Sequence, residues 1–272
     1  MTPRPADEAG FEALTRKIAA ARGFGCANYK DGCLRRRIAV RMRARGVASY
    51  AAYGALLDAD PAEYDPLLDA LTINVTALYR DAAVWETLAA SVLPALWAQD
   101  PPRFTVWSAG CASGEEAYTV AALLHGHAER TRTLDRLARV RIVATDIDRA
   151  SLEAARAGRF ADDRFREMPA ALRARCFPDG EALAALRAMI TVQRHDLLTD
   201  PAPVQGAQLI CCRNVVIYFD RASQGPLMQR FRDALAPGGV LVLGKVETLL
   251  GETRRLFEVV DARQRIFRRA AA

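Results

Sequence analysis

Hydrophobic residues recur every three or four positions through much of the first hundred residues, which is the spacing of one face of a helix. The first such segment begins at Phe11 and ends at the glycines Gly23 and Gly25. Four further segments are predicted to be helical: residues 30–45, 49–57, 61–71 and 84–97. We therefore expect a small all-helical domain over residues 1–100, ending in the linker Asp100-Pro101-Pro102.

After residue 100, short apolar runs alternate with helical segments, as in α/β folds. Strands are predicted at residues 104–108, 140–145, 190–193, 209–212 and 240–244, and helices from Glu115, at residues 151–157 and at residues 224–235. The final segment predicts two antiparallel strands around residues 261–264. We expect an α/β domain over residues 101–272, with a doubly wound, mostly parallel sheet and an antiparallel C-terminal hairpin. A small inserted subdomain is expected near residues 160–190, where the pattern is less regular.

The stretch from Phe104 to Leu124 joins a strand, a turn of small residues and a helix. This arrangement is the first half of a nucleotide-binding unit, in which a glycine turn lets the backbone approach a ligand. Two acids, Glu115 and Glu116, follow the turn directly and would repel a bound phosphate. They argue against a dinucleotide or a triphosphate, and favour a ligand with hydroxyls and a positive charge, such as S-adenosylmethionine.

Polar residues also follow two other predicted strands. Asp146 ends the strand at 140–145, where acidic residues of nucleoside-binding folds accept hydrogen bonds from ribose hydroxyls. Arg213 and Asn214 follow the strand at 209–212. Because ligands of open α/β sheets bind beyond the carboxyl ends of the strands, we expect these residues to face one crevice.

Composition narrows the remaining classes of protein. Half of the residues (51%) are hydrophobic, but no run approaches the ~20 apolar residues of a membrane span, so no membrane insertion is expected. The N-terminus lacks the apolar core of a signal peptide, which favours a cytoplasmic protein. The six cysteines form no CxxC pair, and the three histidines are scattered, so no metal centre is expected.

Residues 30–45 carry most of the cationic character of the helical domain. Apolar residues at four-residue spacing predict an amphipathic helix with a cationic outer face that includes Arg36, Arg37 and Arg41. Such a face is often only a solvated surface, but it could also dock an acidic protein helix, nucleic acid or anionic lipid. The scarcity of interleaved aromatic residues argues against nucleic acid.

Four motifs carry a specific resemblance: LTINVTALYRD (71–81), VWSAGCASGEEAY (106–118), ATDID (144–148) and CRNVVIYFD (212–220). Together they resemble the CheR family of chemotaxis receptor methyltransferases, and the resemblance covers nearly the whole chain. It implies a class I S-adenosylmethionine-dependent methyltransferase that esterifies glutamate side chains on methyl-accepting chemotaxis receptors. The cytoplasmic helices of such receptors would be the partner, and we expect the enzyme to act as a monomer.

The resemblance also implies which residues form the site. Arg80 would pair with the carboxylate of the methionine moiety, and Tyr218 would lie beside the position of methyl transfer. The implied cofactor contacts are Asn74, Thr76, Arg80, Glu116, Asp146, Asp196, Leu197, Arg213 and Asn214. The implied receptor contacts are Arg36, Arg37 and Arg41.

The chain departs from the family pattern at several positions. Asp196 replaces an asparagine and, when ionised, accepts a hydrogen bond but cannot donate one. Ala117, Val246 and Gln208 replace a proline, a serine and an aspartate of the family motifs. Residues 160–190 lack an obvious glycine-rich insertion, which favours a form that does not depend on a tethering receptor peptide.

Three alternatives to this interpretation remain at the level of sequence. The chain could be a methyltransferase of the same fold that acts on another protein or a small molecule. It could be a non-catalytic module that senses S-adenosylmethionine in signalling, for which Asp196 is the only support. A dinucleotide oxidoreductase is disfavoured by the acids that follow the glycine turn.

Overall fold

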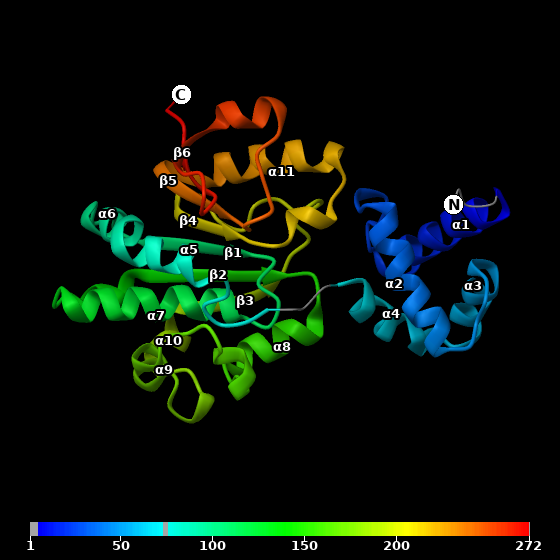
Figure 1. The fold of residues 1–272 in the computed structure, drawn as a ribbon, viewed down its shortest axis with the longest axis horizontal. Coiled ribbons are helices and arrows are strands. Elements are labelled where there is room, and N and C mark those ends of the chain that lie inside the picture. The colour runs from blue at the N-terminus through cyan, green and yellow to red at the C-terminus, as the bar shows by residue number, and fades with distance from the viewer. Residues whose placement is uncertain (1–4, 73–75, 272) are drawn as a thin grey trace. The chain divides into compact units, whose positions relative to one another are not determined.

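A computed structural model describes residues 5–72 and 76–271 of the chain. It divides into two compact units (Figure 1). The helical unit comprises Met1–Ile73 and Tyr218–Ser223, and the α/β unit comprises Asn74–Ile217 and Gln224–Ala272.

The helical unit contains four α-helices in its described residues, and their apolar positions pack inward. These helices are α1 (Pro5–Arg22), α2 (Asp31–Ala44), α3 (Tyr50–Ala59) and α4 (Tyr64–Leu71), with short 3-10 turns η1 (Cys26–Asn28) and η2 (Pro61–Glu63). Ser49 caps α3 by accepting a hydrogen bond from the amide of Ala52 (3.2 Å). Leu34 and Ile38 of α2 are buried at four-residue spacing, as the sequence pattern predicted.

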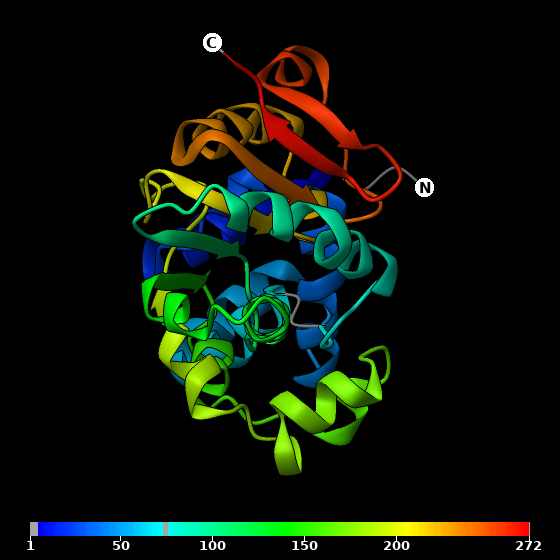
Figure 2. The same cartoon turned by 90° about the vertical axis from the view of Figure 1, so that its left-hand side faces the viewer.

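The described residues of the α/β unit form a seven-stranded sheet in the order β3-β2-β1-β4-β5-β7-β6. The strands are β1 (Phe104–Ala109), β2 (Val140–Asp146), β3 (Ile190–Arg194), β4 (Ala207–Cys212), β5 (Leu235–Leu243), β6 (Phe257–Asp261) and β7 (Ile266–Arg269). The first five are parallel, and β7 runs antiparallel to both β5 and β6. Figure 2 shows the β6–β7 hairpin in red at one edge of the sheet. The predicted fold, a doubly wound sheet of the class I methyltransferase type with a C-terminal hairpin and a preceding helical domain, is confirmed.

The helices of the α/β unit are α5 (Ala82–Thr87), α6 (Leu93–Ala98), α7 (Glu115–Arg130), α8 (Arg149–Ala157), α9 (Ala170–Cys176), α10 (Ala184–Met189) and α11 (Arg221–Ala234), whose first three residues cluster with the helical unit. Shorter helical turns are η3 (Leu88–Val92, a π-helix), η4 (Leu134–Arg139), η5 (Asp162–Phe165), η6 (Pro178–Gly180), η7 (Val216–Tyr218) and η8 (Gly251–Leu256). On one face of the sheet, Phe104 and Val106 join a core with residues of α5, α6, α7 and α10. On the other face, Trp107 packs edge-on against Phe231 of α11. Both faces of β1 and β4 are therefore buried, which explains their continuous apolar runs.

The compact units divide nearer the N-terminus than the predicted boundary at residue 100. Residues 82–98 lie in the α/β unit because Trp85, Leu96 and Trp97 are buried in the core of that unit. The helix predicted at residues 84–97 is divided by the π-helical turn η3, and Pro94 lies in the first turn of α6, which directly follows η3. Between residues 160 and 189, the described chain is helical or irregular, with one isolated bridge between Arg159 and Glu181.

Candidate functional site

The glycine turn after β1 is fixed by its backbone. Gly110 has φ 80°, and a Cβ atom there would approach Val215 Cγ2 to 2.5 Å. Gly114 has φ 97° and begins α7; a Cβ there would lie 3.0 Å from the Cβ of Ala155. Both glycines are therefore required by the close approach of neighbouring segments, and the turn holds β1, α7 and the chain after β4 together.

Asp146 joins the end of β2 to this turn. Its Oδ2 accepts a hydrogen bond from the amide of Ala112 (2.8 Å), and its Oδ1 accepts one from the amide of Asp148 (3.1 Å). Burial raises the pKa of Asp146, while these two amides oppose the shift. The carboxylate is thus held beside the glycine turn. That it binds a sugar stays a prediction.

Glu116, in the first turn of α7, is the second buried acid of the site. The hydroxyl of Ser108 donates to its Oε1 (2.8 Å), and Arg213 Nη1 lies 4.0 Å from its Oε2. Burial raises the pKa of Glu116 to about 7, with Arg213 and Arg80 opposing the shift and Glu247 adding to it. A neighbouring cation would therefore favour the ionised carboxylate strongly.

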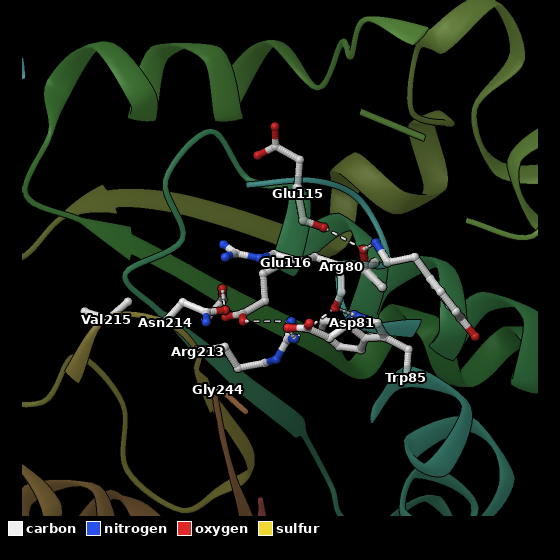
Figure 3. Close-up of polar contacts among 12 residues, drawn as sticks. Arg80, Asp81, Trp85, Glu115, Glu116, Arg213, Asn214, Val215 and Gly244 are labelled. Carbon is white, nitrogen blue, oxygen red and sulfur yellow. Dashed lines mark hydrogen bonds and ion pairs between the residues drawn. The ribbon is translucent and has the colours of Figure 1, made fainter. Parts of the chain in front are cut away.

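Arg213, just after β4, forms the centre of a buried cluster (Figure 3). Its Nη2 donates to the carbonyl of Arg80 (2.8 Å) and to Asp81 Oδ2 (2.8 Å), and its guanidinium lies 4.9 Å from the centre of the Trp85 ring. The side chain is only 4% exposed. These contacts join residues 132 and 133 positions apart, so Arg213 positions the segment that carries Arg80.

The segment from Thr76 to Asp81 lies along α7 and η5. Arg164 donates to the carbonyl of Thr76 (2.7 Å), and the Thr119 hydroxyl accepts from the amide of Tyr79 (3.0 Å). Tyr79 and Asp81 both have φ 61°, a left-handed conformation that needs such support. The carbonyl of Arg80 also accepts a hydrogen bond from the side chain of Trp85 through Nε1 (2.8 Å). Hydrogen bonds to its carbonyl therefore fix the position of Arg80.

Glu247 has a role that the sequence analysis missed. This carboxylate is 3% exposed and accepts hydrogen bonds from four backbone amides, those of Gly244 (2.5 Å), Val215 (2.8 Å), Asn214 (3.0 Å) and Ile217 (3.2 Å). Asn214 needs this support because its φ is 60°. The signal in the sequence is its place directly after Val246, in the turn where the family motif has a serine.

Asp196 follows β3 and is tied to the end of β2 through its neighbour, because the amide of His195 donates to the carbonyl of Asp146 (2.9 Å). Asp196 Oδ1 accepts a hydrogen bond from the amide of Leu198 (2.8 Å). This contact needs only an acceptor, so an aspartate makes it as well as an asparagine would. The side chain of Leu197 is buried, and its carbonyl accepts a hydrogen bond from Arg230.

The structure thus brings Arg80, Glu116, Asp146, Arg213 and Asn214 to the carboxyl ends of β1, β2 and β4. Asn74 lies outside the described residues. Tyr218 clusters with the helical unit, where its carbonyl accepts a hydrogen bond from the amide of Lys30 (2.9 Å). A catalytic role for Tyr218 stays a prediction. So do the cofactor contacts of all the residues predicted to form the site, which are Asn74, Thr76, Arg80, Glu116, Asp146, Asp196, Leu197, Arg213 and Asn214.

The predicted docking residues on α2 differ in their surroundings. Arg41 makes two hydrogen bonds with the buried Glu63 (both 2.9 Å), and Arg37 donates to the carbonyl of Ala70 (2.7 Å). Arg36 and Arg43 are exposed, and between them on the helix lies Val40, which is 47% exposed. The outer face of α2 therefore consists of Arg36, Val40 and Arg43, whereas Arg37 and Arg41 hold the helical unit together.

Two family models match this chain. The CheR methyltransferase, SAM binding domain matches residues 74–266, and the CheR methyltransferase, all-alpha domain matches residues 9–72. The chain belongs to the CheR methyltransferase family. Its α/β unit is accordingly the domain that binds S-adenosylmethionine. The alternative interpretation as a dinucleotide oxidoreductase is therefore excluded.

CheR relatives from three organisms show how far the similarity extends. A chemotaxis protein methyltransferase of Listeria monocytogenes is 32% identical over 87% of this chain and 89% of its own length. Chemotaxis protein methyltransferase 2 of Pseudomonas aeruginosa is 31% identical over 88% of this chain and 86% of its own length. A 104.1 kDa protein of Rhodobacter capsulatus is 36% identical over 94% of this chain, which spans only 27% of that protein.

The described residues fit S-adenosylmethionine chemically. The Oε2 atom of Glu116 lies 4.0 Å from Arg213 Nη1, beyond hydrogen-bond distance, which leaves a buried acceptor suited to an ammonium group. Among the residues that the structure describes, no group of three or more His, Cys, Asp or Glu side chains could hold a metal ion. Nor is any described helix long and apolar enough to cross a membrane.

Proposed function

We propose that this CheR-family chain transfers a methyl group from S-adenosylmethionine to glutamate side chains of methyl-accepting chemotaxis receptors, forming methyl esters. The observation that carries the proposal is the similarity, over nearly nine tenths of both chains, to relatives named chemotaxis protein methyltransferase. Two further observations support it. Four sequence motifs resemble those of the CheR family, and acid and guanidinium groups lie at the carboxyl ends of the strands.

The chemistry places modest demands on the protein. S-adenosylmethionine supplies an electrophilic methyl group on a positively charged sulfur. A glutamate acceptor, with an ordinary pKa near ~4.3, is ionised at neutral pH, so the reaction needs no general base. The contribution of the chain is to bind and orient both reactants and to exclude water.

Each end of the cofactor has a candidate partner among the buried residues. Arg80 would bind the carboxylate of the methionine moiety through a charge-assisted contact. Glu116 would hold the ammonium group, and Asp146 would accept hydrogen bonds from the ribose hydroxyls. Asn74, Thr76, Asp196, Leu197, Arg213 and Asn214 are proposed as further cofactor contacts, and Tyr218 as a residue at the transfer position.

The protein should be incubated with methyl-labelled S-adenosylmethionine and a receptor cytoplasmic fragment. We expect label on the fragment that mild base releases as methanol, because carboxyl esters hydrolyse in base. A matched fragment with its glutamates replaced by alanine should remain unlabelled. Base-stable label, or none on the fragment while a different protein or small molecule is labelled, would contradict the proposed acceptor. Cofactor binding without transfer to any acceptor would favour a sensing module.

The raised pKa of Glu116 predicts a pH dependence of cofactor binding. Because the carboxyl titrates near pH 7 when buried, lowering the pH through this value protonates it and removes the partner of the ammonium group. Affinity should fall about tenfold between pH 8 and pH 6, as expected for one linked proton. Calorimetric titration with S-adenosylhomocysteine measures this affinity. The variant Glu116→Gln should bind more weakly at pH 8, and its affinity should no longer fall between pH 8 and pH 6. If the affinity of that variant still fell tenfold between pH 8 and pH 6, the titrating group would be another residue.

The exposed face of α2 predicts a separate effect on receptor modification. Arg36→Glu should slow methylation of the receptor fragment several-fold, most at low salt, and leave cofactor affinity unchanged, because the encounter with an acidic helix is electrostatically assisted. Arg16→Glu, an exposed charge reversal on α1, is the matched control. Equal rates for the two variants would refute docking by this face.

Arg41→Ala serves as the structural counterpart. It removes two hydrogen bonds from the buried Glu63, which Arg45 and Tyr53 also contact (2.7 Å each). We therefore expect Arg41→Ala to lower the free energy of unfolding by about 1–3 kcal/mol without a specific loss of receptor recognition.

A further inference from the structure

A hollow of about 540 Å³ lies in the α/β unit at the amino ends of β1, β2 and β4, whereas the cofactor residues lie at the carboxyl ends of these strands. It is lined by Arg103 and Thr105 at the start of β1, by Arg141 at the start of β2, and by the loop of residues 203–206 that precedes β4. Because Thr105 and the turn at Gly110 are five residues apart on an extended strand, the hollow is about 15 Å from the glycine turn.

Two of the side chains that line the hollow, those of Thr105 and Arg141, face the same side of the sheet. Thr105 and Arg141 are direct neighbours in the parallel pairing of β1 with β2. Residues two apart on a strand share a face, so Thr105 points to the same side as Trp107, which packs against α11. Arg103 directly precedes β1 and lines the same hollow. Two guanidinium groups and a hydroxyl therefore converge on one region.

These groups have no partners within the described part of the chain. Neither Arg103 nor Arg141 makes a hydrogen bond or an ion pair with another described residue, and no acid lines the hollow. Asp100, the acid nearest in sequence to Arg103, is already paired with Arg136 (2.9 Å) and Arg139 (2.8 Å). Thr105 is 8% exposed, and its hydroxyl likewise lacks a hydrogen-bond partner among the described residues.

The loop that lines the hollow is held in place by a residue that departs from the family pattern. Gln208 is 7% exposed; its Oε1 accepts from the amide of Thr105 (2.6 Å), and its Nε2 donates to the carbonyl of Gly206 (3.1 Å). The side chain thus fixes the loop of residues 203–206 against β1. A neutral amide does so here, where the family motif has an aspartate whose charge would neutralise the arginines.

We propose that this hollow binds a phosphate-bearing small molecule. Guanidinium groups match the geometry and charge of phosphate oxygens, and two unpaired ones beside an unpaired hydroxyl form a suitable donor set. The volume is within the range of small-molecule sites and exceeds what a phosphate group fills, so the ligand has an organic part against Pro102, Pro203 and Val204. The site is separate from the methyl-transfer site and does not depend on the proposed acceptor.

Calorimetric titration of the full chain with pyrophosphate and with ribose 5-phosphate tests the proposal. Saturating S-adenosylhomocysteine keeps the probes out of the cofactor site, and ribose is the control without phosphate. We expect both phosphates to bind, ribose not to bind, and the double variant Arg103→Ala/Arg141→Ala to weaken phosphate binding at least tenfold. Thr105→Val, which keeps the shape of the side chain, should weaken it several-fold.

A matched double variant separates this site from general surface charge. Arg263→Ala/Arg268→Ala removes two exposed positive charges elsewhere in the α/β unit and should bind the probes as the unaltered chain does. Absence of phosphate binding, equal affinities in the two double variants, or binding that is unchanged by Arg103→Ala/Arg141→Ala would overturn the proposal. A melting temperature within the range of the control variant confirms that Arg103→Ala/Arg141→Ala remains folded.

Discussion

Replacing Glu247 with alanine should lower the free energy of unfolding of the α/β unit by about 3–4 kcal/mol, because one buried and three partly buried amides lose their shared acceptor. The four amides belong to Gly244, which is buried, and to Asn214, Val215 and Ile217, which are partly buried, and all four donate to the buried carboxylate of Glu247. Glu247→Gln is informative as well, since an amide group would place two donors against backbone donors. We expect it to destabilise the unit by at least half as much as alanine does.

The effect of Glu247 should reach the cofactor site. Without its acceptor, Asn214 has no support for its left-handed backbone, and the adjacent Arg213 would no longer hold the carbonyl of Arg80 in place. Urea unfolding followed by tryptophan fluorescence measures stability, because all three tryptophans lie in the α/β unit. Glu258→Ala, an exposed acid on β6, is the control and should change stability little. If Glu247→Ala and Glu258→Ala unfold at the same urea concentration, the scaffold role is wrong.

Replacing Arg80 with alanine should weaken S-adenosylhomocysteine binding by a factor between ten and about a hundred, which is about 1.4–2.8 kcal/mol. The physical reason is the loss of a charged contact to the carboxylate of the amino-acid moiety. The substitution leaves the backbone carbonyl that accepts hydrogen bonds from Trp85 and Arg213, so the turn should keep its shape.

Calorimetric titration at pH 8 is the direct measurement, with Arg80→Lys as the comparison. Lysine keeps the positive charge but cannot form two parallel hydrogen bonds, so it should recover part of the affinity. A melting temperature near that of the unaltered chain would show that the loss is local. Unchanged affinity in Arg80→Ala would refute the assignment of this residue to the cofactor.

Most elements of the fold were predictable because each strand and helix carries a local pattern. The apolar run at 209–212 indicated a strand with two buried faces, and β4 is buried at all six of its positions. The glycine turn and the acid at the end of β2 were likewise predictable, since each is indicated by residue type within a few positions of a predicted strand. The assignment of residues 82–98 to the α/β unit could not be predicted, because a helical pattern does not show which core its apolar face joins.

The contacts within the site were less accessible to sequence reasoning. Arg213 was expected to contact the cofactor, and the structure adds that it binds the carbonyl of Arg80, Asp81 and the face of Trp85. The docking residues Arg37 and Arg41 look equivalent to Arg36 in the sequence, but only the packing of α2 shows which side chains turn inward.

The sequence by itself determined the order of elements, the glycine turn with Glu116, and the acid Asp146, because these depend on spacing and residue type along a short stretch. Only the tertiary structure decided that Glu247 holds the chain after β4, that Arg213 holds Arg80, and that Arg103 and Arg141 lack partners among the described residues. Those facts depend on atoms brought together from positions 30 to 130 residues apart, and burial then sets the strength of each contact.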